Sequence, residues 1–167
     1  NEAHRWIAAC QSTLPDVTIV TQNIDGMHQL AGATRVLELH GSLWRTRCDS
    51  CGARTDDRSV PFTATRCRCG SGRARPDIVW FGDALNQRVI AEAVTAIEKC
   101  DLLVSIGTSG VVYPAAQLPM HAKQTGATLI EVNPEETVVS RFFDVQLRAP
   151  ATQALDILCE GVERPQA

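Results

Sequence analysis

The sequence lacks the features that mark membrane-spanning, secreted and nucleic-acid-binding proteins. No apolar run approaches the roughly 20 residues that span a bilayer, and no signal peptide is present. There is no basic tail or strongly basic helix, and the formal net charge of -3 argues against nucleic acid as an obligatory partner. We therefore expect a soluble globular protein with no direct nucleic-acid partner and no membrane association.

Cysteine is present in an odd number, seven, which does not suit a framework of paired disulfides. Four cysteines fall between positions 48 and 69, whereas Cys10, Cys100 and Cys159 are scattered among apolar neighbours. One cluster with scattered single thiols is typical of a metal site plus buried thiols. A reducing compartment follows from this interpretation, and we predict a cytoplasmic location.

Internal repeats, low-complexity segments and the G-x-G-x-x-G fingerprint of many dinucleotide-binding proteins are also absent. Short apolar runs alternate instead with amphipathic segments. Helices are predicted over 1–12, with Trp6 and Cys10 facing inward, over 86–100, and over 114–125, with Pro119 as an internal kink. Strands are predicted over 17–21, 36–39, 77–81, 102–106, 129–132 and 144–147. This alternation predicts an α/β fold with an open parallel sheet and helices on both faces.

The stretch 45–75 interrupts this pattern. It holds four cysteines, eight arginines, three aspartates and little aliphatic content, so it cannot build an apolar core alone. Cys48 and Cys51 are two residues apart, and 15 residues later comes Cys67, which is metal-ligand spacing. Cys69 follows after a single residue, a gap that strains binding from one loop. We predict a structural zinc ion on these four thiolates, in preference to free thiols or a disulfide.

This zinc-binding module is predicted to span residues 45–76, and the main domain residues 1–44 and 77–167. The length of 167 residues supports one domain with a small insert.

Three of the predicted strands end in residues suited to binding a ligand. They are Gln22, Asn23 and Asp25; Gly107, Thr108 and Ser109; and Asn133, Pro134 and Glu135. Taken alone, each of these segments is typical of an ordinary loop whose polar residues cap a helix or form a turn. Because the carboxyl ends of parallel strands are where α/β proteins place ligands, the three together favour a bound nucleotide. His40 follows a fourth strand, at the end that corresponds to Gln22, Asn23 and Asp25, so we expect it in one pocket with them. The glycine after it lets the backbone come close, and a neutral imidazole there can take up a proton.

Five segments, taken in order, resemble one known family. TQNIDGMH, LHGSLWRTRC, RPDIVWFGDAL, IGTSGVVYPAA and EVNPE are similar to the motifs of the sirtuins, the NAD-dependent protein lysine deacylases, and the similarity covers nearly the whole chain. The resemblance implies a Rossmann-like sheet, NAD as cofactor and structural Zn²⁺ in the insert. The family's Gly-rich amino-terminal segment has no counterpart, so the sequence resembles a sirtuin without its first part.

The resemblance also implies roles for individual residues. His40 would be the general base that helps to deprotonate a ribose hydroxyl as the acyl group passes from lysine to ADP-ribose. The NAD contacts would be Gln22, Asn23, Ile24, Asp25, Gly107, Thr108, Ser109, Asn133, Pro134, Glu135 and Ala151. An acylated-lysine protein or peptide would bind as an added strand along Val79, Trp80, Phe81 and Gly82. Zinc would be held by Cys48, Cys51, Cys67 and Cys69.

Three functions stay open on the sequence. The first is an NAD-dependent lysine deacylase, the second a non-catalytic NAD- and zinc-binding fragment, and the third a protein ADP-ribosyltransferase. The motifs are most similar to the branch that removes succinyl and malonyl groups as well as acetyl groups, but the residues that select acidic acyl groups lie in the absent segment. We expect a monomer, with weak or no turnover from this chain alone.

Overall fold

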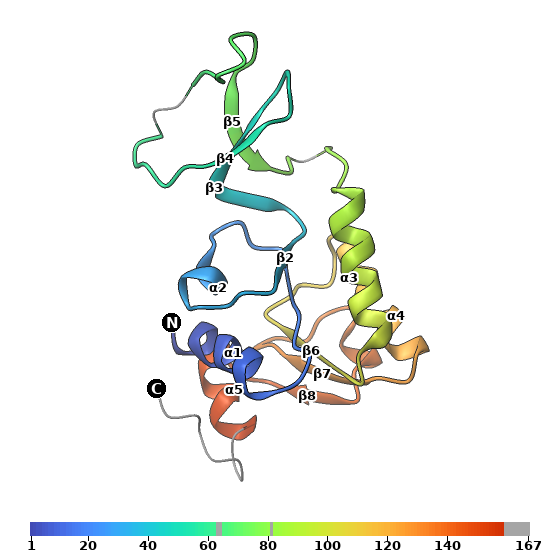
Figure 1. Cartoon of the computed structure of the whole chain (residues 1–167). Coiled ribbons are helices and arrows are strands. Elements are labelled where there is room, and N and C mark those ends of the chain that lie inside the picture. The colour runs from blue at the N-terminus through green and yellow to red at the C-terminus, as the bar shows by residue number, and fades with distance from the viewer. Residues whose placement is uncertain (63–64, 81, 159–167) are drawn as a thin grey trace.

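The computed structural model describes residues 1–62, 65–80 and 82–158. Its strands form three sheets (Figure 1). Two sheets are parallel: β1 (Ile19–Thr21) with β2 (Val36–Glu38), and β6 (Leu102–Ile106), β7 (Thr128–Val132) and β8 (Val145–Leu147). The third is antiparallel, in the order β4 (Arg54–Asp56), β3 (Gly41–Cys48), β5 (Ala74–Ile78). The predicted parallel α/β fold is confirmed, although within the described residues its strands form two sheets.

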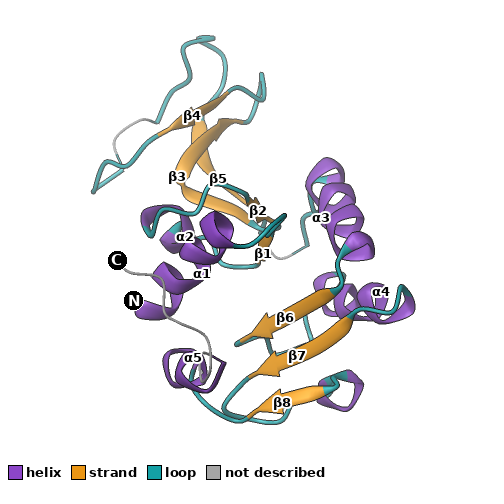
Figure 2. Ribbon diagram, turned by 60° about the horizontal axis from the view of Figure 1, so that its bottom comes forward, coloured by secondary structure: helices purple, strands orange, loops and turns teal. Residues whose placement is uncertain are grey.

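α3 and α4 pack together, with α4 against β6 and β7, and α1 and α5 pack together on the opposite side of the molecule (Figures 1 and 2). Their bounds are α1 (Glu2–Thr13), α2 (Met27–Leu30), α3 (Gln87–Lys99), α4 (Leu118–Gln124) and α5 (Ala151–Leu158), with 3₁₀ turns at Ala115–Gln117 and Ser140–Phe142. The Asn86 side chain caps α3 by accepting from the backbone N–H groups of Arg88 and Val89. Among the described helices, none combines the length and apolarity that a membrane crossing requires.

In α1 the most buried side chains are Ala3 and Ala8, and Trp6 and Cys10, which were predicted to face inward, are half-buried. One predicted detail of the helices is wrong. Pro119 does not kink a long helix. It lies in the first turn of α4, where the missing N–H has no helical partner to lose, so the proline starts the helix.

The predicted strand 77–81 is also misplaced. The strand is β5, which ends at Ile78 and pairs with β3 rather than with the main sheet, through the registers Gly41↔Ile78 and Cys48↔Ala74. The eight residues of β3 offer a long antiparallel partner, and that pairing outweighs the apolar pattern that suggested a central strand. Both predicted module boundaries, after residues 44 and 76, fall inside these two strands. Phe81 lies outside the described residues.

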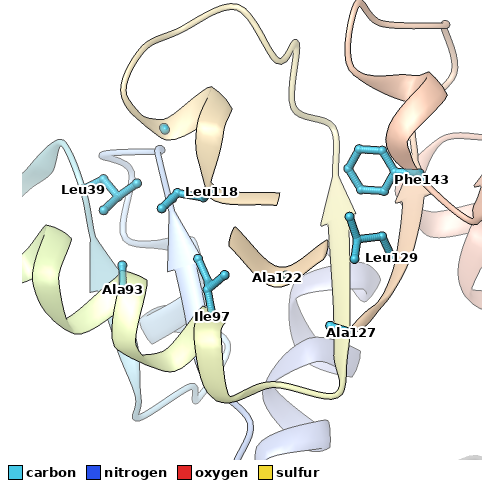
Figure 3. Packing of buried hydrophobic residues seen from close by; sticks show 9 residues of the cluster. Leu39, Ala93, Ile97, Leu118, Ala122, Ala127, Leu129 and Phe143 are labelled. Carbon is cyan, nitrogen blue, oxygen red and sulfur yellow. The ribbon is translucent and has the colours of Figure 1, made fainter. Parts of the chain in front are cut away.

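The largest hydrophobic core joins the two parallel sheets. Leu39, which follows β2, packs in one buried cluster with Ala93 and Ile97 of α3, Leu118 of α4 and Leu129 of β7 (Figure 3). Leu39 is only 2% exposed. Because the next residue is His40, this packing fixes where the backbone delivers the imidazole.

Candidate active site

The loop that follows β1 is fastened to the start of β3 by three of its carbonyl groups. The Gln22 carbonyl lies 2.8 Å from His40 Nδ1, the Ile24 carbonyl accepts from the Leu43 N–H at 2.9 Å, and the Asp25 carbonyl accepts from Trp44 Nε1 at 2.5 Å. The parallel register Thr21↔Glu38 already places the two strand ends side by side. The loop is therefore held rigidly against His40.

The hydrogen bond of His40 fixes its tautomer. A carbonyl oxygen can only accept, so Nδ1 carries the hydrogen and donates it to the Gln22 carbonyl at 2.8 Å. Nε2 of the neutral ring then holds the free lone pair, and the half-buried side chain can accept a proton there. The predicted neighbourhood of His40 and the amide-and-acid loop is present in the structure.

Gly41 allows the chain to turn directly after His40. Its φ is +76°, and a Cβ at this position would lie 2.0 Å from the Asp77 carbonyl oxygen of β5. The β3 and β5 backbones thus approach more closely than any other residue permits. Val79 adds a hydrogen bond from its N–H to the His40 carbonyl at 3.0 Å, so His40 is held from both sides.

The other two strand ends come together as a second group. The register Ile106↔Val132 sets Gly107 beside Asn133, and the Asn133 amide donates to the Thr108 carbonyl at 3.0 Å. The same amide accepts from the Glu135 N–H at 3.3 Å. Asn133 thus links two loops. No hydrogen bond or ion pair between described residues joins this group directly to the loop at 22–25, and their common support is the core around Leu39.

A buried carboxylate supports the second group. Glu131 of β7 is 2% exposed and accepts from Ser140 Oγ at 2.6 Å, Arg148 Nη1 at 2.7 Å and Thr137 Oγ1 at 2.9 Å. Burial alone would raise the pKa of Glu131, but these hydrogen bonds outweigh it and hold the pKa below its usual range. Arg148 also donates to the Glu135 carbonyl, so the ion pair braces the loop that carries Asn133.

The four clustered cysteines fit a zinc ion. Their Sγ atoms all lie within 4.8 Å of one another, and two pairs, Cys48–Cys69 and Cys51–Cys67, are 3.7 Å apart. Zn–S bonds of about 2.3 Å in a tetrahedron place sulfurs about 3.8 Å apart. The single residue between Cys67 and Cys69 does not prevent this, because a tight turn directs both sulfurs inward. The cluster is compatible with the predicted structural zinc.

The four thiols do not ionise independently. The Ser71 and Gly72 backbone N–H groups, with help from the Cys67 thiol, lower the pKa of Cys69 to about 6. The Cys69 N–H favours ionisation of Cys67, but the thiols of Cys69 and Cys48 outweigh it and raise the pKa of Cys67 to about 12. A zinc ion would replace the protons that the four sulfurs share.

A cavity of about 280 Å³ lies where the small module meets the main domain. Asp77, one of the residues that line it, is 6% exposed, and its carboxylate forms ion pairs with the Nε atoms of three arginines: Arg45 at 2.8 Å, Arg54 at 2.9 Å and Arg47 at 3.3 Å. These ion pairs tie β3 and β4 to β5. They hold in place the segment that leads into Val79 and Trp80, the described part of the predicted substrate strand together with Gly82.

Comparison with known proteins identifies the chain. The sequence profile described as the Sir2 family matches residues 1–114. A deacylase described as "NAD-dependent protein deacylase Sir2" from Mycolicibacterium smegmatis is 44% identical over 167 residues, covering 96% of this chain and 69% of that protein. The chain belongs to the Sir2 family. A crystal structure of a Sir2 homologue with NAD matches with a TM-score of 0.90 at 38% identity, over 97% of this chain and 64% of that one.

Two further relatives set the extent of the match. NAD-dependent protein deacylases from Aquifex aeolicus and Aeropyrum pernix are 39% and 44% identical, and this Sir2-family chain spans 66% of the length of each. A Sir2 structure with a p53 peptide and NAD⁺ matches with a TM-score of 0.86 at 30% identity, covering 96% of this chain and 69% of that one.

Some residues that shape the site had no assigned role in the sequence analysis. Trp44 holds the Asp25 carbonyl, and its place four residues after His40 is the signal that marks it. Glu131 and Arg148 form the brace behind Asn133; an acidic residue inside an apolar strand signals such a pair. Ala151 begins α5, and no contact of its side chain with the other strand ends is recorded within the described residues. The roles assigned to individual NAD-contacting and substrate-binding residues remain predictions.

Proposed function

We propose that the protein containing this chain is an NAD-dependent protein lysine deacylase, which moves an acyl group from a lysine side chain to ADP-ribose. The observation that carries the proposal is the position of His40, whose Nδ1 is occupied by the Gln22 carbonyl and whose Nε2 is left to take a proton at the end of a parallel strand. Support also comes from relatives at 44% identity that are named NAD-dependent protein deacylases.

The strand-end residues fit a dinucleotide. The side-chain amides of Gln22 and Asn23 and the hydroxyls of Thr108 and Ser109 have no recorded hydrogen bond to another described residue, so they remain available to a ligand. Gly107 has φ +64°, and a Cβ there would meet nothing within 4 Å, so its backbone is open to close approach. The first pair would hold the nicotinamide end, and the second pair would hold a ribose.

Bound NAD would supply an ADP-ribosyl group that becomes reactive when nicotinamide leaves and that then accepts the acyl group. His40 Nε2 would take a proton from a sugar hydroxyl, while the Gln22 carbonyl keeps the Nδ1 hydrogen and stabilises the imidazolium that forms. Asp25 uses Oδ1 to accept from the Met27 N–H at 2.9 Å, so Oδ2 would face the positively charged end of the ligand.

An acylated peptide would bind beside β5. In the order β4–β3–β5, β5 pairs with β3 along one edge. At its other edge the Ala74 N–H donates to the Thr65 carbonyl at 3.2 Å, and from Arg75 to Ile78 no strand among the described residues pairs with that edge. An extended peptide can pair with such an edge through main-chain hydrogen bonds, which tolerate many sequences. The Val79 N–H is already used by the His40 carbonyl, so the opposite edge of this segment would receive the substrate and bring it close to His40.

We also propose that the protein works in a reducing compartment such as the cytoplasm. No disulfide joins any of the described cysteines, and four of them are grouped as a metal site.

The test is NAD-dependent release of free lysine from acetyl-lysine and succinyl-lysine peptides. The chain would be assayed alone and with a relative's Gly-rich amino-terminal segment fused before Asn1, with mass spectrometry to detect O-acyl-ADP-ribose. We expect O-acyl-ADP-ribose from the fused form. His40→Ala should lower its turnover by about 10²–10⁴-fold while leaving NAD binding within a few-fold.

Each alternative has its own result. NAD binding with no product from either form on any acyl peptide would favour the non-catalytic fragment. Transfer of label from NAD onto protein, with no O-acyl-ADP-ribose, would favour ADP-ribosyl transfer. A His40→Ala variant with full turnover would remove the proposed base.

A further inference from the structure

The charge of this chain is divided very unevenly. Residues 45–75 contain eight arginines, three aspartates and neither lysine nor glutamate, a formal charge of +5. Since the whole chain carries -3, the remaining residues carry -8. Four thiolates on one zinc ion would contribute -2, which still leaves the module at +3. Such separation of charge points to an anionic partner for the module.

The strand registers gather these arginines on one face. Arg54 of β4, Arg47 of β3 and Arg75 of β5 lie directly opposite one another in a row across the sheet. Arg73 shares a face with Arg75 because side chains alternate along an extended strand, and an isolated bridge pairs Arg73 with Arg66. We call Arg47, Arg54, Arg66, Arg73 and Arg75 the arginine face.

The acids of the module do not neutralise this face. Asp49 accepts from the backbone N–H of Arg73, and Asp57 from the backbone N–H and hydroxyl of Ser59, so both serve local turns. Asp56 of β4 lies opposite Arg45, and no ion pair to it is recorded among the described residues. The buried Asp77 carboxylate forms ion pairs with the Nε atoms of Arg47 and Arg54. Among the described residues, no acidic partner is recorded for the side chains of Arg66, Arg73 and Arg75.

Like charges placed directly opposite in a sheet are destabilising. The registers contain three such pairs, Arg54↔Arg47, Arg47↔Arg75 and Arg66↔Arg73. Of these arginines, only Arg47 and Arg54 have a recorded ion pair with Asp77 among the described residues, and their side chains remain 36% and 49% exposed. Their terminal guanidinium nitrogens are thus left to bind carboxylates from outside the chain, in the bidentate manner that suits guanidinium groups.

We propose that the arginine face binds an acidic segment of the acylated protein substrate, and that the protein prefers acyl-lysines with aspartate or glutamate nearby in the sequence. This rests on the proposed function. Arg75 precedes Val79 by four residues, about 13 Å along an extended strand. A peptide that adds alongside β5 would therefore place residues about three to six positions from its acyl-lysine on the arginine face. The charge of -8 on the remaining residues repels a long polyanion, which favours a short acidic peptide over nucleic acid.

The test is the binding of fluorescein-labelled peptides to the full 167-residue chain, followed by anisotropy. One acetyl-lysine peptide is neutral, and two others carry three glutamates on the amino or on the carboxyl side of the lysine. At low ionic strength we expect one acidic peptide to bind about tenfold more tightly than the neutral one, since a few partly exposed ion pairs each contribute a factor of about two to five. Addition of about 0.5 M salt should remove the preference.

Substitutions locate the effect. The double variant R73E/R75E should lose the preference for the acidic peptide and keep the affinity for the neutral one. The matched control R5E/K99E makes the same change of charge at exposed positions of α1 and α3 and should keep the preference. Zinc content and the thermal midpoint establish that each variant is folded, and the salt dependence of the unaltered chain tests the same point without a substitution.

The possible outcomes separate the inference from the proposed function. Equal affinity for acidic and neutral peptides overturns the inference and leaves the deacylase proposal intact. If an acidic peptide binds in an arginine-dependent way but the fused form turns over no acetyl peptide, the peptide-binding role of the arginine face is supported and the proposed deacylase function is rejected. Tighter arginine-dependent binding of a DNA duplex than of the acidic peptides overturns the assignment of a peptide partner.

Discussion

Replacing Glu131 by glutamine tests whether the buried ion pair holds the second group of strand-end loops. Glutamine keeps the volume but removes the charge, and its amide hydrogens face the Ser140 hydroxyl and the Arg148 guanidinium, which are donors in the native structure. Removing one partner of a buried pair costs about 3–5 kcal/mol. Arg148 is 32% exposed and keeps bonds to Gln146 and Glu135, so water recovers part of this cost.

We therefore expect Glu131→Gln to lower the free energy of unfolding by about 2–3 kcal/mol, a large part of the roughly 5–15 kcal/mol that stabilises a domain. The measurement is urea unfolding at pH 7 and 25 °C. Glu136→Gln is the matched control, because Glu136 is an exposed acid of the same loop with no recorded contact among the described residues, and its effect should stay within about 0.5 kcal/mol.

The pH dependence gives this prediction a second readout. The pKa of Glu131 is lower in the folded protein than in the unfolded chain, so its stabilisation is fully present above the unfolded value, near pH ~4.3, and is lost as the pH falls through the folded value. Glutamine does not titrate. The stability gap between the native protein and Glu131→Gln should therefore shrink below about pH 4, while the gap to Glu136→Gln should not narrow in this way. A gap under about 0.5 kcal/mol at pH 7, or one that widens in acid, would refute the reasoning.

Two further predictions concern the support of His40 and the metal. Gly41→Ala should destabilise the protein by more than about 3 kcal/mol in urea unfolding, because a positive φ and the Asp77 carbonyl both oppose a Cβ. The control is Gly32→Ala, where φ is also positive but a Cβ would meet open space, and it should cost about 1–2 kcal/mol. Equal losses of stability in the two variants would contradict the close-approach argument. Cys67→Ser should reduce bound zinc from one ion per chain to well under half, measured by atomic emission, whereas Cys100→Ser, whose sulfur bonds the Ile97 carbonyl, should retain it.

The sequence alone determined the features that depend on neighbouring residues. The apolar face over 86–100 sufficed to predict α3, because helical periodicity links residues only three or four positions apart. Parallel strands end at one edge, so the order and apolar content of the strands sufficed to predict that His40 lies near the loop at 22–25. The four cysteines were predicted as one site because thiolates bind zinc at recognisable spacings.

Only the tertiary structure decided which partners the charged and edge residues found. The apolar run after Pro76 does not indicate that β5 pairs with β3. The two strands are about 30 residues apart in the sequence, and they are joined by main-chain hydrogen bonds that carry no sequence signal. Three arginines from β3 and β4 meet on Asp77 only because the registers bring them there. Glu131 and Arg148, and the carbonyl that fixes the tautomer of His40, likewise depend on folded geometry, because a hydrogen bond exists only when both partners have been brought within about 3 Å.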